Sequence, residues 1–268
     1  MKVGIIGVGV LGKTHADWLR LETSHEVLAY DIDAEKSDST LEDIWDNADA
    51  AVICLPTDSQ DDGHLNTLAI EEFIEKASDS GAAGMLIIIR STVPVGFTRR
   101  MARENPRLKF YFVPEFLTEK TADEDFRYPL GMVIGSRDRN KDIQTIFPKP
   151  RIYFDASWEE AELVKLTINS FYAMKVIFAN EIDDYCRVNS IDYQRIKRII
   201  AANPRIGSIM ADNQGIDVHL RIAQDGKAGY GGKCLPKDTR QLATLMQMTK
   251  SGFGLIEKVV EINDKIRK

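Results

Sequence analysis

The residues around Cys234 have the types and the spacing of a nucleophilic site. The cysteine closes the segment Gly229-Tyr230-Gly231-Gly232-Lys233-Cys234, and Pro236 follows at a place that suits the first position of a helix. We therefore expect the thiol just before a helix N-terminus, where the helix dipole and nearby Lys233 and Lys237 should lower its pKa and favour the thiolate. The close glycines would let a substrate reach the sulfur across bare backbone.

The other two cysteines lack such a setting. A cysteine is more often a buried structural residue than a reactive one, and we interpret Cys54 and Cys186 as core residues of a strand and a helix. The cysteines are odd in number and widely scattered, so they form neither a disulfide framework nor a zinc spacing. The sequence predicts no metal site, and this cysteine usage favours a reducing cytoplasm.

A second group of residues, at the N-terminus, predicts a dinucleotide site. The motif Gly7-Val8-Gly9-Val10-Leu11-Gly12 follows a strand and opens a helix, and Asp31 stands nineteen residues after its last glycine. In this pattern the glycines let the backbone approach a pyrophosphate at the positive end of the helix, and the acid accepts hydrogen bonds from the adenosine ribose. Because a carboxylate would repel an extra phosphate, Asp31 favours NAD over NADP.

A third candidate lies on a long predicted helix. Lys165 and Asn169 are four residues apart, so they share one helix face and can hold one oxygen between them. In isolation, such a pair is more often solvated helix surface than a site.

The elements that must position these residues fall into two sets, and the first predicts an α/β fold. Strands alternate with helices, which implies a doubly wound parallel sheet with helices on both faces. Ser39 and Glu42 read as a capping box that opens a short helix. We expect an NAD-binding domain of this kind over residues 1–150, with strands at Lys2–Ile6, Glu26–Tyr30, Ala50–Leu55, Met85–Ile89, Lys109–Val113 and Gly131–Ile134 and a helix at Leu65–Ala77.

The second set predicts an all-helical domain over residues 151–268. Ser157 and Glu160 form another capping box, after which helical spacing persists to about Val188. A helix of that length usually links domains or builds an interface. Further helices are expected at Tyr193–Ala202, from about Pro236 to Met248, and from Phe253 to the end.

Composition and charge exclude several classes of protein. The 268 residues include 35 basic and 41 acidic side chains, and the net charge of −6 gives no sign of a nucleic-acid binder. The longest apolar run, Met85–Ile89, is far too short to span a bilayer, and the N-terminus enters a strand pattern without the cleavage site of a signal peptide. We expect no membrane partner.

Several segments together resemble the UDP-glucose/GDP-mannose dehydrogenase family. The segment from Gly229 to Thr239 closely resembles that family's active-site signature, and the likeness runs from Lys2 to the last helix. Other segments resemble the family in the same order along the chain: Val52-Ile53-Cys54-Leu55-Pro56-Thr57, Ser91-Thr92-Val93-Pro94-Val95-Gly96, Pro114-Glu115-Phe116-Leu117, Glu162-Leu163-Val164-Lys165 with Asn169, Asn180-Glu181, and Arg205-Ile206-Gly207.

The resemblance implies a double oxidation that uses NAD. A nucleotide sugar's primary alcohol would become an aldehyde and then, through a thioester on Cys234, a uronic acid. The resemblance favours UDP-glucose as the substrate and leaves GDP-mannose and UDP-N-acetylmannosamine open. Lys165 and Asn169 would stabilise oxyanions, Asp238 and Thr92 would hold a catalytic water, and Glu119 would assist hydrolysis.

The resemblance also implies binding roles. NAD would be contacted by Lys36, Thr57, Thr92, Glu119 and Lys237 beside the glycine motif and Asp31. The sugar nucleotide would be contacted by Glu115, Phe116, Leu117, Lys165, Asn169, Tyr230 and Gly231. Arg205 resembles an arginine that is lent across a dimer interface to the partner's nucleotide.

Two expectations concern assembly and affinity. Ile256, Val259, Val260 and Ile266 form an apolar stripe that needs a partner, and with the long helix it suggests a homodimer. The family's third domain, which binds much of the nucleotide, has no counterpart in this sequence, so weak nucleotide binding is expected. A rival interpretation is a catalytically reduced NAD-binding or partner protein.

Overall fold

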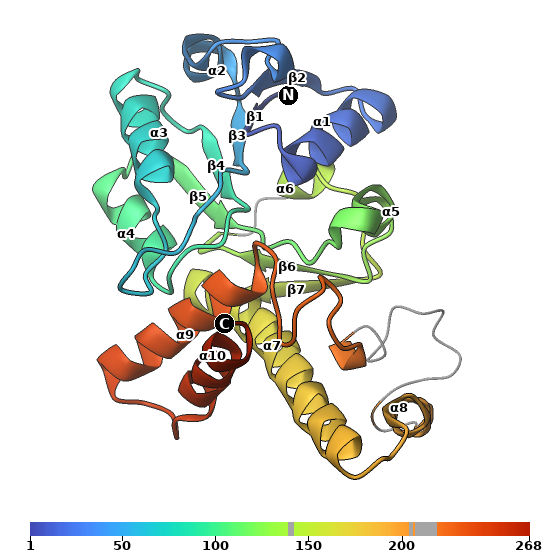
Figure 1. Cartoon of the computed structure of the whole chain (residues 1–268). Helices are drawn as coiled ribbons and strands as arrows, with labels where there is room; N and C mark the ends of the chain where they lie inside the picture. The colour runs from blue at the N-terminus through green and yellow to red at the C-terminus, as the bar shows by residue number, and fades with distance from the viewer. Residues whose placement is uncertain (139–141, 204–205, 207–218) are drawn as a thin grey trace. The chain divides into compact units, whose positions relative to one another are not determined.

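A computed structural model describes residues 1–138, 142–203, 206 and 219–268. The chain divides into two compact units. Unit 1 comprises residues 1–58 and 65–165, and unit 2 comprises residues 59–64 and 166–268 (Figure 1). The domain boundary expected near residue 150 stays a prediction.

Unit 1 is built on one sheet of seven strands in the order β2-β1-β3-β4-β5-β6-β7. The first five strands in this order pair in parallel, β6 runs antiparallel to β5, and β7 runs parallel to β6. The strands are β1 (Lys2–Ile6), β2 (Glu26–Tyr30), β3 (Ala50–Ile53), β4 (Leu86–Ile89), β5 (Lys109–Phe112), β6 (Gly131–Gly135) and β7 (Ile152–Ala156).

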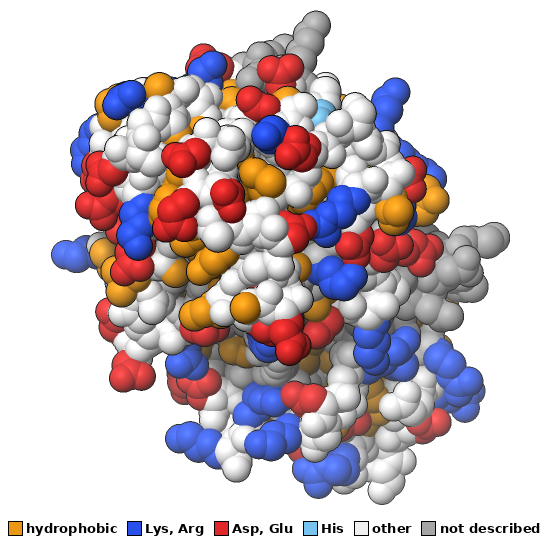
Figure 2. Space-filling model, turned by 90° about the horizontal axis from the view of Figure 1, so that it is seen from above, with side chains coloured by type: hydrophobic (Ala, Val, Ile, Leu, Met, Phe, Trp, Pro, Cys, Tyr) orange, Lys and Arg blue, Asp and Glu red, His pale blue; other side chains and the backbone are white. Residues whose placement is uncertain are grey.

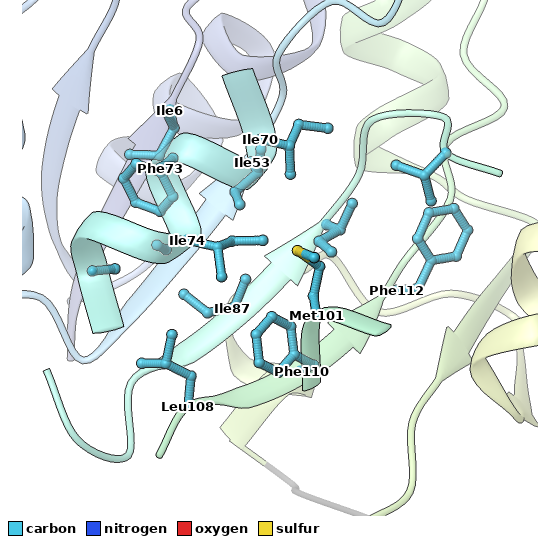
Figure 3. Packing of buried hydrophobic residues seen from close by; sticks show 14 of the residues in the cluster. Ile6, Ile53, Ile70, Phe73, Ile74, Ile87, Met101, Leu108, Phe110 and Phe112 are labelled. Carbon is cyan, nitrogen blue, oxygen red and sulfur yellow. The ribbon is translucent and has the colours of Figure 1, made fainter. Parts of the chain in front are cut away.

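Helices cover both faces of this sheet, as the alternation in the sequence predicts. Ile6, Ile53 and Ile89 face one apolar cluster, which contains α2, α3 and α4, whereas their neighbours Ile5 and Val52 face a second cluster with α1 and α6 (Figure 3 shows part of the first). The helical elements of this unit are α1 (Val10–Glu22), η1 (Ala34–Lys36), α2 (Leu41–Asn47), α3 (Leu68–Asp79), α4 (Phe97–Glu104), η2 (Glu119–Thr121), α5 (Ala122–Arg127), α6 (Asp142–Thr145) and the start of α7 (Trp158–Val188).

Three details of unit 1 differ from the sequence-based expectations. The sheet is not wholly parallel, and β7 was not expected. Its side chains Ile152 and Phe154 are exposed on an edge strand, so the sequence there lacks the buried pattern of the inner strands. The capping box of α2 uses Thr40 and Asp43 rather than Ser39 and Glu42, because the Ser39 N–H already donates to the Ala29 carbonyl of β2 (3.2 Å).

Helix α1 is anchored by a buried histidine. His15 is fully buried, and its Nε2–H donates to the Ile146 carbonyl at 2.6 Å. Burial lowers the pKa of His15 to about 3, with the nearby Arg90 charge acting in the same direction. The ring therefore stays neutral, and it fixes the helix that follows the glycine motif.

Unit 2 consists of helices over its described residues: the greater part of α7, α8 (Tyr193–Ala202), α9 (Leu235–Thr249) and α10 (Leu255–Ile266). The capping box at Ser157 and the helix to Val188 are confirmed. The apolar stripe of α10 was expected to need a second chain, and this is wrong for much of it. Val259 and Ile266 pack within the unit against Ala173, Val176 and Ile177 of α7.

Charged side chains cover much of the surface. On the face drawn in Figure 2, acidic and basic side chains are intermixed, and hydrophobic side chains form smaller groups between them. In the part of the chain that the structure describes, no helix has both the length and the apolar character needed to cross a bilayer.

Candidate active site

The glycine motif lies between the carboxyl end of β1 and α1. Gly7 has a φ of +90°, which favours glycine, and a Cβ on Gly12 would overlap the Gly7 carbonyl oxygen. Gly9 is the N-cap of α1, and a Cβ there would meet no atom within 4 Å. Val10 and Leu11 form the first turn of the helix. Open space therefore faces a helix N-terminus whose N–H groups lack partners in the helix, which suits a pyrophosphate.

Asp31 follows β2 directly and lies beside the glycine motif. Its carboxylate accepts a hydrogen bond from the Val8 N–H (2.7 Å) and another from the Asp33 N–H (3.0 Å). Lys36 ends η1, where its exposed Nζ lies 3.0 Å from an Asp33 carboxylate oxygen. These contacts put the acid where the ribose of a bound dinucleotide would lie, and they support the fit of NAD to this loop.

Two threonines meet where β3 and β4 end. Thr57 donates from Oγ1 to the Thr92 carbonyl at 2.7 Å, and both residues are buried. Ser91 donates in turn to the Leu55 carbonyl, also at 2.7 Å. Because the carboxyl ends of parallel strands share one edge of the sheet, the two segments predicted to contact NAD are joined at that edge.

The buried Lys165 and the half-buried Glu115 form a pair in unit 1. The Lys165 ammonium donates to a Glu115 carboxylate oxygen (2.9 Å) and to the Glu115 carbonyl (2.6 Å), and it lies 5.4 Å from the centre of the Phe116 ring. The Leu117 N–H donates to the other carboxylate oxygen (2.8 Å). Lys165 thus fixes the backbone of the Glu-Phe-Leu segment from α7.

This pairing decides the charge of Glu115. Burial alone would raise the pKa of the carboxyl group, but the charge and the hydrogen bond of Lys165 outweigh it and hold the pKa below its ordinary value. Glu115 is therefore held as an anion at neutral pH.

A second polar group surrounds Asp238 in unit 2. The fully buried carboxylate accepts a hydrogen bond from Asn169 Nδ2 (2.5 Å) and pairs with the Lys237 ammonium (2.7 Å). Cys234 is the N-cap of α9, one turn before Asp238, and Pro236 occupies the second helical position rather than the first. The first turn of α9 thus carries an exposed thiol at its N-cap and a buried acid that is bonded to an amide of α7 and to the amine of Lys237.

The three cysteines differ in exposure, although Cys54 lies just after β3 and is partly buried rather than a core residue of the strand. Cys234 is exposed, whereas Cys186 is buried in an apolar cluster of unit 2. Desolvation raises the pKa of Cys54 to about 12, so this thiol stays protonated near neutral pH. Only Cys234 combines access with a helix N-terminus.

For the remaining predicted site residues we describe only their position and exposure. Tyr230 is buried and Gly231 half-buried in the segment before Cys234, and Glu119 is exposed at the start of η2. Arg205 lies outside the described residues.

Comparison with known proteins decides the family. The chain matches the NAD binding domain of the UDP-glucose/GDP-mannose dehydrogenase family over residues 36–149 and that family's central domain over residues 159–265. A UDP-glucose 6-dehydrogenase of Campylobacter jejuni is 31% identical over an alignment of 305 residues, gaps included. The alignment covers 100% of this chain and 73% of the relative. The chain belongs to the UDP-glucose/GDP-mannose dehydrogenase family. It is an NAD-dependent oxidoreductase, and the predicted cofactor is confirmed.

Other members give the same picture of this dehydrogenase. A UDP-glucose 6-dehydrogenase of Rhizobium meliloti is 33% identical over 81% of the chain and 50% of the relative. Among solved structures, a UDP-glucose dehydrogenase from Pyrobaculum islandicum has a TM-score of 0.84 at 24% identity and covers 98% of this chain and 68% of that one. A UDP-D-ManNAc dehydrogenase from Pyrococcus horikoshii also has a TM-score of 0.84, at 23% identity, over 99% of this chain and 69% of that one. These structures confirm the fold.

One buried acid of the dehydrogenase had no role expected from the sequence. Glu162 is fully buried on α7, and its carboxylate accepts hydrogen bonds from the Gly96 N–H (2.6 Å) and the Thr98 N–H (2.9 Å) at the start of α4. It therefore fastens the end of the segment that carries Thr92. The signal in the sequence is a charged residue one turn before Lys165, on the same side of the helix.

Glu162 should make the stability of the dehydrogenase depend on pH. Burial raises the pKa of this carboxyl group from its ordinary 4.5 to about 7, despite the hydrogen bonds to its anion. A raised folded-state pKa contributes stability that is complete below pH 4.5 and is lost as the pH rises through 7. Urea unfolding should show that the free energy of the wild type, relative to that of Glu162→Gln, falls from pH 5 to 8 by roughly 3 kcal/mol at most. The comparison with Glu162→Gln removes the opposite contribution of His15, whose lowered pKa makes stability rise with pH over part of this range.

Glu159→Gln is the matched control on the same helix. The Arg99 hydrogen bond lowers the pKa of Glu159, so the free energy of unfolding of this variant relative to the wild type should stay constant between pH 5 and 8. Parallel curves for wild type and Glu162→Gln would show that Glu162 does not titrate in this range.

Proposed function

We propose that this dehydrogenase oxidises the primary alcohol of UDP-glucose to the carboxylate of UDP-glucuronate in two hydride transfers, with a thioester on Cys234 between them. The observation that carries the proposal is the N-cap position of the exposed Cys234, one turn before a buried Asp238 bonded to Asn169 and Lys237. The names of the relatives supply the substrate class.

Bound NAD would accept each hydride. The glycine motif would hold its pyrophosphate, and Asp31 would accept hydrogen bonds from its ribose. In the first oxidation the sugar's C6 alcohol loses a hydride and a proton to become an aldehyde. The Lys165 ammonium and the Asn169 amide would lie against the reacting oxygen and stabilise its negative charge.

The Cys234 thiolate then adds to the aldehyde carbon and leaves an oxyanion on the thiohemiacetal. Loss of a second hydride from that carbon gives the thioester, and the second NAD must replace the spent cofactor. Water then attacks the thioester carbon and releases the carboxylate and the Cys234 thiolate, and the family resemblance assigns its activation to Asp238, Thr92 and Glu119. In sum, one alcohol, two NAD⁺ and one water give one carboxylate, two NADH and three protons.

The experiment follows NADH and product together. Purified protein is mixed with NAD and, separately, UDP-glucose, UDP-N-acetylmannosamine or GDP-mannose. Two NADH per UDP-glucuronate, with UDP-glucose giving the highest kcat/KM, would support the proposal. A higher kcat/KM with either other sugar would reassign the substrate. No NADH with any sugar would favour the NAD-binding partner protein instead.

Asp31 should set the choice of cofactor. We expect kcat/KM to be higher with NAD than with NADP, because the Asp31 carboxylate repels the extra phosphate. Asp31→Ala should narrow this ratio by about tenfold, a change of about 1.4 kcal/mol, without abolishing turnover. Steady-state rates with both cofactors measure the ratio.

Asp17→Ala is the matched control, because it removes an exposed α1 carboxylate that pairs with Lys13. It should leave the ratio unchanged. Comparable efficiency of the wild type with both cofactors would contradict the role of Asp31.

We propose further that the dehydrogenase is a homodimer that pairs through α7. Phe171, Phe178 and Tyr185 are seven residues apart on this helix, so they lie along one face, and each is about half exposed or more. Sedimentation should show a dimer, and Phe178→Glu should give monomers because a charge would be buried at the centre of the stripe. Leu130→Glu, at an exposed apolar position of unit 1, should stay dimeric. A monomeric wild type would contradict the proposal.

A further inference from the structure

One buried amide side chain of helix α10 binds the segment that precedes Cys234. This side chain is Asn263. Asn263 is only 4% exposed. Its Oδ1 accepts a hydrogen bond from the Tyr230 N–H (2.8 Å), and its Nδ2 donates to the Tyr230 carbonyl (3.2 Å). The carboxamide thus pairs with both polar backbone groups of one residue, as a neighbouring strand would, and only one orientation of the amide satisfies both.

An asparagine is costly at this place in the helix. It stands one turn after Val259 and just after Ile262, on the side of α10 that packs against α7. Asparagine is a poorer helix former than the residues around it, and a buried amide without partners would destabilise the fold. Packing alone would favour an apolar residue at 263, so the amide is explained by the backbone that it binds.

The backbone of the segment is shaped to receive these side chains. Gly229 has a φ of +76°, and a Cβ there would overlap Asn263 Oδ1. Its N–H donates to Asn180 Oδ1 of α7 (3.0 Å), and Asn180 Nδ2 donates in turn to the Val176 carbonyl (2.7 Å). Two asparagines from two helices therefore hold two consecutive residues of the segment.

A third helix side chain holds the preceding turn. Arg267 pairs with Asp225 (2.7 Å) and donates to the Ala228 carbonyl (3.3 Å). A Cβ on Gly231 would overlap both Asp225 and Arg267. Side chains of α7 and α10 and Arg267 at the end of α10 therefore bind the backbone at Ala228, Gly229 and Tyr230. Beyond Tyr230, Gly231 and Gly232 add little stiffness of their own before Cys234 begins α9.

We propose that Asn263 is a positioning residue for Cys234. By fixing Tyr230, it fixes the end of the glycine segment from which the thiol is presented at the N-terminus of α9. The identity of Cys234 as the nucleophile rests on the proposed function, whereas the hold of Asn263 on the segment does not.

The test compares two truncations on the same face of α10. Asn263→Ala removes the amide, whereas Val259→Ala shortens an apolar side chain of the buried cluster that also contains Tyr230 and leaves the hydrogen bonds of the segment in place. In Asn263→Ala, hydrogen exchange of the peptide 225–233 should accelerate by about tenfold or more, because the Tyr230 N–H loses its acceptor. Alkylation of Cys234 by iodoacetamide at pH 7 should slow, because the thiol leaves its fixed place at the helix N-terminus.

Turnover should change in a way that a general loss of stability would not. For Asn263→Ala we expect kcat to fall about tenfold while the KM for NAD stays within about twofold, since the NAD loop belongs to the other unit. Val259→Ala should retain wild-type exchange of this peptide, alkylation and kcat. Asn263→Asp keeps the acceptor for the Tyr230 N–H and should lie between wild type and Asn263→Ala.

The outcomes separate the two proposals. If the wild type oxidises none of the sugars, the proposed function fails, while exchange and alkylation still decide whether Asn263 positions the segment. Wild-type exchange and alkylation in Asn263→Ala, or the same changes in Val259→Ala, would overturn the role of Asn263. If Asn263→Ala does not fold, Asn263→Asp and Asn180→Ala replace it in the comparison with the wild type. In each of them, hydrogen exchange of the peptide 225–233 should be faster than in the wild type.

Discussion

Cys234→Ser is expected to abolish the net formation of uronic acid. The sulfur lies exposed at the N-cap of α9, and a serine hydroxyl in its place would be a far weaker nucleophile than a cysteine sulfur. Removal of a nucleophile that acts together with its neighbours commonly costs about a thousandfold or more in kcat. The rate of UDP-glucuronate formation, followed by chromatography beside NADH, measures the loss.

Cys54→Ser is the matched control, because burial keeps the Cys54 thiol protonated. This variant should form acid at a rate within about twofold of the wild type, after correction for any loss of stability. Near-normal acid formation by Cys234→Ser would contradict the thioester mechanism, and the second hydride would then have to leave from the aldehyde hydrate, with NAD as the acceptor.

Lys165→Met should lower kcat by about a hundredfold to a thousandfold, the usual cost of a lost oxyanion donor. It should also destabilise the protein. Lys165 is the ammonium that pairs with the Glu115 carboxylate and carbonyl, and breaking a buried pair from one side typically costs about 3–5 kcal/mol. Steady-state kinetics and urea unfolding measure the two effects on the same preparation.

The double variant Lys165→Met with Glu115→Gln separates stability from catalysis. It removes both charges, so it should recover most of the lost free energy of unfolding, yet kcat should stay low because the oxyanion donor is still missing. Recovery of kcat together with stability would show that Lys165 only supports the fold.

The pH dependence of this pair has a definite sign. In the wild type the pKa of Glu115 is held below its ordinary 4.5, so the pair contributes stability above that pH and loses it as the pH falls through the lowered value. In Lys165→Met the charge and the hydrogen bond of Lys165 are lost, and burial is opposed only by the Leu117 hydrogen bond and the Arg90 charge, so the pKa of Glu115 should rise. The sign then reverses, and this variant should gain stability relative to the wild type as the pH falls from 7 to 5.

Most of the fold could be predicted from local patterns. The strands Lys2–Ile6 and Glu26–Tyr30 and the helix Tyr193–Ala202 have the expected bounds, because each is a continuous run of one period between clear breaks. The reversal of β6 and the edge strand β7 could not be predicted. Strand direction and edge position depend on which strand lies beside which, and residues 131–135 read alike in either direction.

The candidate site also contains residues that the sequence revealed and residues that only the structure revealed. The glycine motif, Asp31 and the helix start after Cys234 were found from spacing, because one turn of backbone creates each of them. Glu162 and Asn263 were not found, since each acts on backbone more than thirty residues away. A single polar residue on a buried helix face has no local pattern that tells a hydrogen bond to a distant loop from an exposed side chain.

By itself the sequence determined the class of this protein: an α/β dinucleotide fold, a long helix, and a cysteine placed at a helix N-terminus. Those features follow from short-range steric and hydrogen-bonding preferences that each segment carries alone. Only the tertiary structure decided the partners of the charged and amide side chains. Lys165 meets Glu115 and Asn169 meets Asp238, although either side chain of α7 could have faced solvent. Burial made these pairings necessary, because an ion or amide removed from water is stable in the fold only where a partner of complementary charge or hydrogen bonding meets it.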